Sequence, residues 1–207
     1  MKKTTVSQKE VLGKSKLLKF LIKRESIERL LQYLYTFPER EMSLSDLSKE
    51  TGISKSTVSR LIGILQEAGI IEVIKLNTIH RIKANLNEFS YTKRKIAYNL
   101  SIVYESGLVE WLLAWANERG LHPKAVIVFG SFRNGDDIST SDIDLAVEVI
   151  DDAGPQHFEL VDKDGKSVTV LDRKIQLHIF KRSDIDINFF NNVANGIVLH
   201  GFLEVKP

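Results

Sequence analysis

The sequence predicts an α+β fold in two parts, because its two halves differ in charge and in hydrophobic pattern. Residues 1–100 carry 19 Lys and Arg against 10 Asp and Glu, whereas residues 101–207 carry 10 against 17. The basic half has apolar residues at helical spacing and then a hairpin pattern, and the acidic half has strand-like runs that predict a small mixed sheet. A chain of 207 residues is long enough for two small domains. The change of charge indicates modules with different partners.

The composition excludes several kinds of chemistry. The chain has no cysteine, which rules out disulfides, thiolate zinc sites and a cysteine nucleophile. No stretch approaches the roughly 20 apolar residues of a membrane span. The basic N-terminus lacks the apolar run and the cleavage site of a signal peptide. These features predict a soluble, cytoplasmic protein with no membrane partner.

Two helices are predicted on the N-terminal side of Gly52. Apolar residues recur at helical spacing from Ile27 to Tyr35, and this helix is expected to end near Pro38. Ser45 can cap a short second helix through its hydroxyl oxygen. Gly52 can supply the left-handed backbone that ends that helix.

A third helix is predicted from a cap at Ser54 through Ala68, and its two faces differ in character. One face is apolar and consists of Val58, Leu61, Ile62 and Leu65. The opposite face, near the N-terminal end, is polar and basic and consists of Lys55, Ser56, Thr57, Ser59 and Arg60. A helix with such a free face can contact base edges and phosphates in a DNA groove.

Two short strands are predicted to follow, Ile70–Leu76 and Ile79–Ala84, joined at Asn77 and Thr78. The second strand carries the basic side chains His80, Arg81 and Lys83. A basic hairpin in this place suits a wing that lies on the DNA backbone.

The order of helix, helix, glycine turn, helix and hairpin resembles the winged helix-turn-helix regulators related to the MarR and ArsR groups. The resemblance is carried by the string LSDLSKETGISKSTVSRLIGILQEAGIIEVI. It implies a DNA-binding domain over residues 1–87 that binds double-stranded DNA, and a homodimer is the natural way to read two half-sites. The DNA-binding residues implied are Lys55, Ser56, Thr57, Ser59, Arg60, Arg81 and Lys83. The alternative is a small helical domain used for protein contacts.

The middle of the chain, residues 88–120, is predicted to be mostly helical, with a break near Ser106 and Gly107. Trp111 and Trp115 belong to an apolar stripe on the second part and are expected in the core. This segment can act as a linker between the modules, as a dimer interface, or as both.

The acidic half places two carboxylates on one predicted strand. The apolar run Ala125–Phe129 predicts a strand covered on both faces, and Gly130 and Ser131 follow it directly. Farther along, strand alternation puts Asp142 and Asp144 on the same face, about 6.6 Å apart. Paired carboxylates can hold divalent cations, which in turn can hold nucleotide phosphates. Glycine permits close approach of the backbone, and the serine offers an N–H and a hydroxyl to a phosphate.

The string FGSFRNGDDISTSDIDLAV looks like the signature of the polymerase-β nucleotidyltransferase superfamily, and it is most similar in style to the minimal nucleotidyltransferases. The resemblance implies a nucleotidyltransferase-like α/β domain over residues 121–207. It implies that Gly130 and Ser131 bind the triphosphate of an NTP, with Arg133 as a further phosphate contact. It also implies that Asp142 and Asp144 are the catalytic, Mg²⁺-binding acids.

A third carboxylate, usual in active members of that superfamily, is not found at the expected place. The neighbouring strand is predicted over Lys174–Phe180, and its polar positions are Gln176 and His178. Other acids without clear registration are Glu159, Asp162 and Asp172. A second SDID string at residues 183–186 precedes a helical pattern and is interpreted as a helix cap.

Three functions therefore remain open. The first is a transcriptional regulator whose transferase-like domain binds nucleotide or metal and biases DNA affinity. The second is an active metal-dependent nucleotidyltransferase that moves a nucleoside monophosphate from NTP to an acceptor. The resemblance to the minimal nucleotidyltransferases also permits a role as an antitoxin beside a toxin protein. The third is an RNA- or tRNA-modifying enzyme that uses the basic module as a nucleic-acid clamp.

Overall fold

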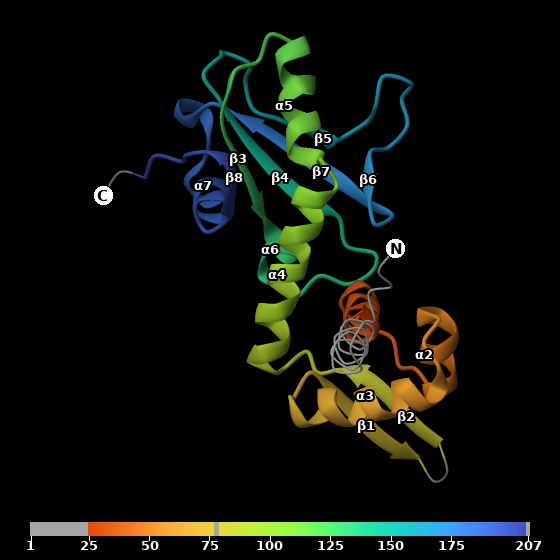
Figure 1. The fold of residues 1–207 in the computed structure, drawn as a ribbon. Coiled ribbons are helices and arrows are strands. Elements are labelled where there is room, and N and C mark those ends of the chain that lie inside the picture. The colour runs from red at the N-terminus through yellow and green to blue at the C-terminus, as the bar shows by residue number, and fades with distance from the viewer. Residues whose placement is uncertain (1–24, 77–78, 206–207) are drawn as a thin grey trace, which may run out of the picture. The chain divides into compact units, whose positions relative to one another are not determined.

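The computed structural model describes residues 25–76 and 79–205, and the chain divides between Asn85 and Leu86 into two compact units (Figure 1). The predicted turn at Asn77 and Thr78 lies outside the described residues. No helix in the described ranges is long and apolar enough to cross a membrane. Each unit is an α+β structure of its own, as the sequence predicts.

The first unit has, among its described residues, three helices and an antiparallel hairpin. Residues 25–36 are helical. They are followed by α2 (Leu44–Thr51), α3 (Lys55–Glu67), β1 (Ile71–Leu76) and β2 (Ile79–Ala84). Met42 forms an isolated antiparallel bridge with Ile82, so the hairpin is tied to the segment that leads into α2. The predicted apolar face of α3 is buried, which leaves the opposite face exposed.

The cap of α2 differs from the prediction. Ser43, not Ser45, is the N-cap: its Oγ accepts a hydrogen bond from the Asp46 backbone N–H, and Asp46 Oδ2 accepts one in return from the Ser43 N–H at 3.0 Å. This reciprocal pair is a capping box, and it fixes the first helical residue at Leu44. Sequence reasoning overlooked that Asp46 can fill the third helical position.

The second unit is built on a mixed sheet with helices on both faces. In chain order its elements are α4 (Phe89–Glu105), α5 (Leu108–Glu118), β3 (Pro123–Phe129), α6 (Gly130–Asn134), β4 (Ile143–Val149), β5 (Gln156–Glu159), β6 (Thr169–Val170), β7 (Arg173–Phe180), the 3₁₀ turn η1 (Arg182–Asp184), α7 (Ile187–Ala194) and β8 (Ile197–Gly201). The strand order is β5-β7-β4-β3-β8, with β6 paired to β7. Only the β4–β7 pair is parallel among these described strands.

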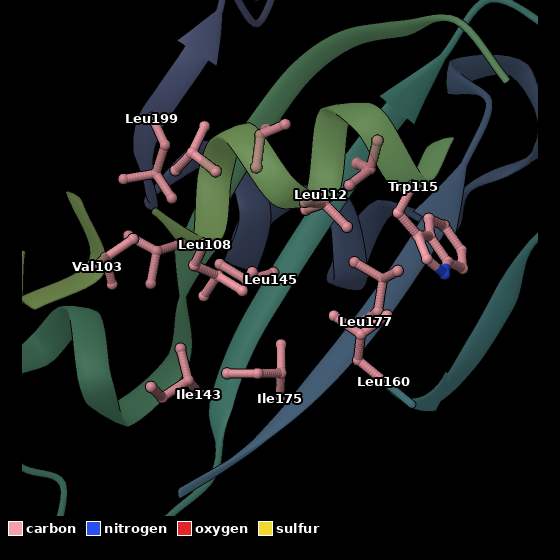
Figure 2. Close-up of a cluster of buried hydrophobic side chains, with 14 of the residues drawn as sticks. Val103, Leu108, Leu112, Trp115, Ile143, Leu145, Leu160, Ile175, Leu177 and Leu199 are labelled. Atoms are coloured by element: carbon pink, nitrogen blue, oxygen red, sulfur yellow. The ribbon is translucent and has the colours of Figure 1, made fainter. Parts of the chain in front are cut away.

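Helices α4 and α5 cover one face of this sheet, and their residues enter its core. Figure 2 shows Leu108, Leu112 and Trp115 of α5 against Leu145 and Leu177 of the strands. The segment 88–120, predicted as a linker or dimer interface, thus supplies one layer of the second unit. The alternate residues of β3 face the other way and pack with Val193 of α7.

The expectation that both tryptophans are buried is wrong for Trp111, which is 36% exposed. Trp111 lies one residue before Leu112, and successive helix residues are about 100° apart around the axis. Since Leu112 points into the core, Trp111 lies at the edge of the buried face. The predicted break between the helices is confirmed: Gly107 has φ 69°, a left-handed conformation that glycine adopts without strain.

Ser43→Ala is expected to lower the free energy of unfolding by about 1 kcal/mol, because the first turn of α2 loses its side-chain acceptor. Urea denaturation followed by far-UV circular dichroism measures the change. Ser45→Ala is the matched control, since Ser45 is exposed inside the same turn and should change stability by less than about 0.5 kcal/mol. Equal losses in the two variants would contradict the capping role of Ser43.

Candidate functional site

The glycine–serine turn lies directly beside the start of β4. The antiparallel register pairs Phe129, the last residue of β3, with Asp144 of β4. Gly130 follows with φ 70°, and a Cβ atom placed on it would overlap Oδ2 of Asp144. Glycine is therefore required here both by the backbone conformation and by the closeness of the carboxylate.

The two predicted acids lie on the α7 side of the sheet. Ile143 and Leu145 are fully buried in the core on the α4–α5 side, so strand alternation turns Asp142 and Asp144 the other way. Burial, reinforced by the negative charge of Asp142, raises the pKa of the Asp144 carboxyl above its usual value. The pair is thus a site of concentrated, incompletely balanced negative charge.

Gln176 occupies the neighbouring position on β7. The parallel register pairs Asp144 with Gln176, and Gln176 Nε2 donates a hydrogen bond of 3.2 Å to Asp142 Oδ2. The strand on which a third acid was sought is therefore the correct neighbour, and the residue facing the acids is an amide. In the described part of the chain, no group of three or more His, Asp or Glu side chains is arranged to hold a metal ion.

Three of the other acids of this unit, Glu159, Asp162 and Asp186, have structural partners. Glu159 binds Lys174 Nζ at 2.8 Å and also accepts from Ser167 Oγ. Asp162 Oδ1 closes a turn by accepting two backbone hydrogen bonds at 2.9 Å. Asp186, in the second SDID string, caps α7 by accepting from the Asn188 and Phe189 N–H groups, as predicted. Asp172 is exposed, with a left-handed φ of 59°.

Asp142 and Asp144 fit a hard divalent cation such as Mg²⁺. That ion is commonly held by one or two carboxylates, with substrate phosphates and water completing the octahedron. The pKa of the Asp144 carboxyl is raised, first by burial and then by the charge of Asp142, and a bound cation would offset both effects. Gln176 donates to only one oxygen of Asp142, which leaves the remaining carboxylate oxygens able to coordinate an ion.

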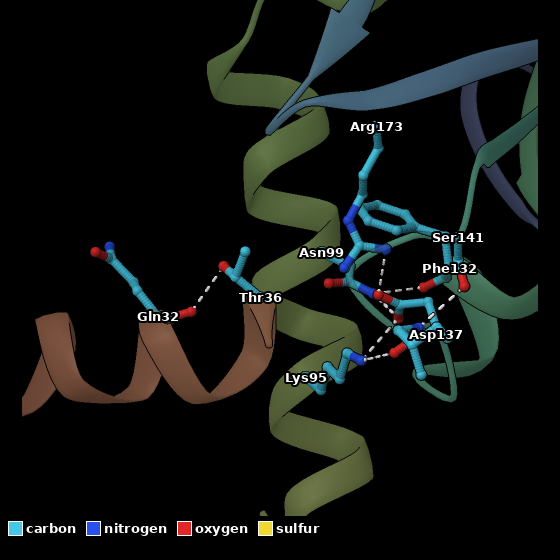
Figure 3. A network of polar contacts seen from close by, with 9 residues as sticks. Gln32, Thr36, Lys95, Asn99, Phe132, Asp137, Ser141 and Arg173 are labelled. Carbon is cyan, nitrogen blue, oxygen red and sulfur yellow. Dashed lines mark hydrogen bonds and ion pairs between the residues drawn. The ribbon is translucent and has the colours of Figure 1, made fainter. Parts of the chain in front are cut away.

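The loop between α6 and β4 is anchored by a buried ionic cluster that sequence reasoning missed (Figure 3). Asp137 is fully buried and contacts Lys95 Nζ at 3.2 Å and Arg173 Nη1 at 2.7 Å. Asn99 Nδ2 donates to Asp137 Oδ1 and to the Phe132 carbonyl, both at 2.8 Å. The cluster joins α4, the loop and the start of β7, and the loop leads directly into the two acids of β4.

A pattern in α4 could have revealed this cluster. Tyr91, Lys95, Asn99 and Val103 recur every four residues and are all buried. A lysine and an asparagine on a face otherwise occupied by large side chains predict buried polar groups, and such groups need partners. The identity of the partners could not be read from the sequence, because Asp137 is 42 residues away from Lys95.

Arg133, predicted to meet phosphate, lies in the last turn of α6. It borders a small cavity together with Asn99 and Val103 of α4, and its Nη1 donates to Asn134 Oδ1 at 3.1 Å. Within the described residues, no hydrogen bond or ion pair connects it to Asp142 or Asp144. The structure thus brings Gly130 against Asp144, and Ser131 follows Gly130 directly at the start of α6.

The predicted DNA-binding face of α3 is exposed at Lys55, Ser56, Ser59 and Arg60. Thr57 is only half-exposed, and its backbone N–H and Oγ1 both bond Ser54 Oγ in the helix cap. On β2, Arg81 and Lys83 are half-buried, and Lys83 Nζ lies 3.2 Å from Glu72 of the paired strand. Among these side chains, Lys55 and Arg60 combine positive charge with exposure.

Comparison with protein families agrees with this division. The model of the MarR family matches residues 29–77, and the model of the polymerase beta nucleotidyltransferases matches residues 116–201. The chain thus contains a MarR-like domain followed by a nucleotidyltransferase-fold domain, in the order that the sequence predicts. The second match runs from α5 into β8 and so includes the two acids and Gln176. No curated protein sequence matches the chain.

Asp137→Asn is expected to destabilise the nucleotidyltransferase module by about 3 kcal/mol or more, because it leaves Lys95 and Arg173 buried without a counter-charge. Thermal or urea unfolding followed by tryptophan fluorescence reports on this module, since Trp111 and Trp115 both belong to it. Asp136→Asn is the control, because the adjacent Asp136 is exposed. Similar stability of the two variants would contradict the role given to the cluster.

Proposed function

We propose that this protein is a transcriptional regulator that binds double-stranded DNA through its MarR-type module and a Mg²⁺–nucleoside triphosphate through its nucleotidyltransferase module. In this proposal the nucleotide is mainly a ligand, and its binding changes the affinity for DNA. The observation that carries the proposal is the position of Gln176, which faces Asp144 and bonds Asp142.

An amide at position 176 allows a nucleotide to bind but cannot catalyse transfer of its nucleoside monophosphate. Gln176 cannot take a proton from an attacking hydroxyl group, as a carboxylate could. It also adds no negative charge to a site that already holds two acids. Asp142 and Asp144 still supply oxygen ligands for a cation, which would neutralise phosphate charge when bound. The site therefore keeps the groups needed to hold a nucleotide and lacks one group that would speed transfer.

DNA binding is supported by the exposed polar face of α3. Lys55 and Arg60 are exposed cations near the N-terminal half of the helix, and Ser56 and Ser59 offer hydroxyl groups on the same face. Phosphate contacts from such cations set affinity and salt dependence, while side chains that reach base edges set sequence preference. One small module covers little DNA, so we include a homodimer that reads two half-sites in the proposal.

Binding of Mg²⁺–NTP is expected to change the affinity for DNA by about fivefold or more, the lower end of usual allosteric couplings. The measurement is fluorescence anisotropy of a labelled duplex that the protein has selected from a random pool. ATP, GTP, CTP and UTP are compared, each with Mg²⁺.

The variant Asp142→Asn/Asp144→Asn provides the control for that experiment. It should bind the duplex like the wild type but show no response to nucleotide, and calorimetry should show that it no longer binds Mg²⁺–NTP. Identical DNA affinity with and without every nucleotide would reject the regulatory coupling.

An active nucleotidyltransferase is the second candidate, favoured by the retained Gly130 and by the two acids that face the same side of the sheet. If the missing acid limits transfer, Gln176→Asp should raise it by about 100-fold or more, the usual contribution of a general base. Pyrophosphate release and labelling from radioactive NTP measure this rate.

Gln176→Asn is the matched control, because it shortens the side chain equally and adds no charge. It should not raise the rate. Rapid transfer by the wild type, lost in Asp142→Asn, would make the nucleotide a substrate and establish the second candidate in place of the first.

A further inference from the structure

An aromatic cluster lies next to the two acids on the same face of the sheet. His157 of β5 and His178 of β7 are opposite each other in register, and their rings stack at 4.0 Å with an interplanar angle of 12°. Phe189 of α7 lies 5.1 Å from the His178 ring, and Phe129 lies 5.2 Å from it. The cluster therefore connects the edge strand β5 with the end of β3 and with α7.

The cluster forms one wall of a cavity of about 220 Å³. The lining includes Gln156, His157, His178, Asp184, Ile185 and Phe189. Sites for drug-sized ligands are usually 300–1,000 Å³, so this cavity has room for a ring system rather than for a whole nucleotide. Its wall combines flat rings with a few polar groups, which is the composition that favours a planar heterocycle.

Packing in the core does not explain the position of His157, which is the outermost ring of the cluster. Phe129 and Phe180 are buried with Val193 in the core beneath α7, whereas His157 is exposed. Burial lowers the pKa of His178 to about 4, so His178 is neutral at physiological pH. One face of the His157 ring thus stacks on a neutral ring, while His157 itself stays exposed and lines the cavity.

The cavity lies at a suitable distance from the acids. His178 follows Gln176 by two residues on β7, a step of about 6.6 Å along the strand. Gln176 is the residue that faces Asp144, so the imidazole pair begins one such step beyond the acids. A sugar can bridge a gap of this size between a phosphate group and a base.

We propose that this cavity is a nucleobase subsite, in which the base of a nucleoside triphosphate stacks on His157 while its phosphates lie at Gly130, Ser131 and the two acids. The inference rests on the proposed function, since it assumes that the module binds a nucleotide. Stacking on a flat ring is tolerant of base identity, because every base has a π-face. The subsite therefore adds affinity for a nucleotide over a bare triphosphate.

The test compares two ligands by calorimetry on the full-length protein: Mg²⁺–ATP and Mg²⁺–tripolyphosphate, which has no base. His157→Ala should weaken binding of ATP about tenfold and leave tripolyphosphate binding unchanged, in line with the usual effect of removing a stacking ring. His157 is exposed, so the variant should fold, and its thermal midpoint verifies this. His200→Ala is the control, because His200 is an exposed histidine of β8 outside the cavity.

Three results contradict the inference in distinguishable ways. Equal loss of affinity for both ligands in His157→Ala, or unchanged affinity for ATP, would reject the base subsite and leave the phosphate site in place. Failure of the wild type to bind either ligand would reject the proposed function and the subsite together.

Discussion

The two-residue alternation along β4 is the constraint on which both faces of the second unit depend. Ile143 and Leu145 are fully buried in the core beneath α4 and α5, so Asp142 and Asp144 have only the opposite face available. The same register then determines which groups surround the acids, because Phe129 pairs with Asp144 on one side and Gln176 on the other. A shift of β4 by one residue would turn the two acids into the core and the two apolar side chains toward the site.

The buried cluster around Asp137 complements this constraint. The loop that connects α6 to β4 has no regular structure along most of its length, yet it must deliver β4 in one register. Asp137 joins that loop to Lys95 of α4 and Arg173 of β7 in a region without water contact. Since an unpaired buried charge is costly, alternative loop conformations that separate these groups are disfavoured. Charge pairing thus favours one conformation of a loop that has few backbone hydrogen bonds.

The sequence predicted the elements well and the long-range partners poorly. The Asp142–Asp144 pair was predictable because strand alternation is local, and the same holds for the buried face of α3. Ser43 was missed because two serines can cap α2, and the choice depends on the reach of Asp46. Trp111 was misplaced because helical periodicity does not fix the width of the buried face. The partners of Lys95 could not be predicted, since they depend on tertiary contacts across 42 residues.

The position of Gln176 also has consequences for the ion-free protein. A third carboxylate there would add a negative charge to a pair in which burial and Asp142 already raise the pKa of Asp144. The amide instead donates a hydrogen bond to Asp142 and adds no charge to the site. The site can therefore persist without a bound cation at lower electrostatic cost than a three-acid site. That property suits a ligand-responsive domain, because a sensor must be stable in both its empty and its occupied state.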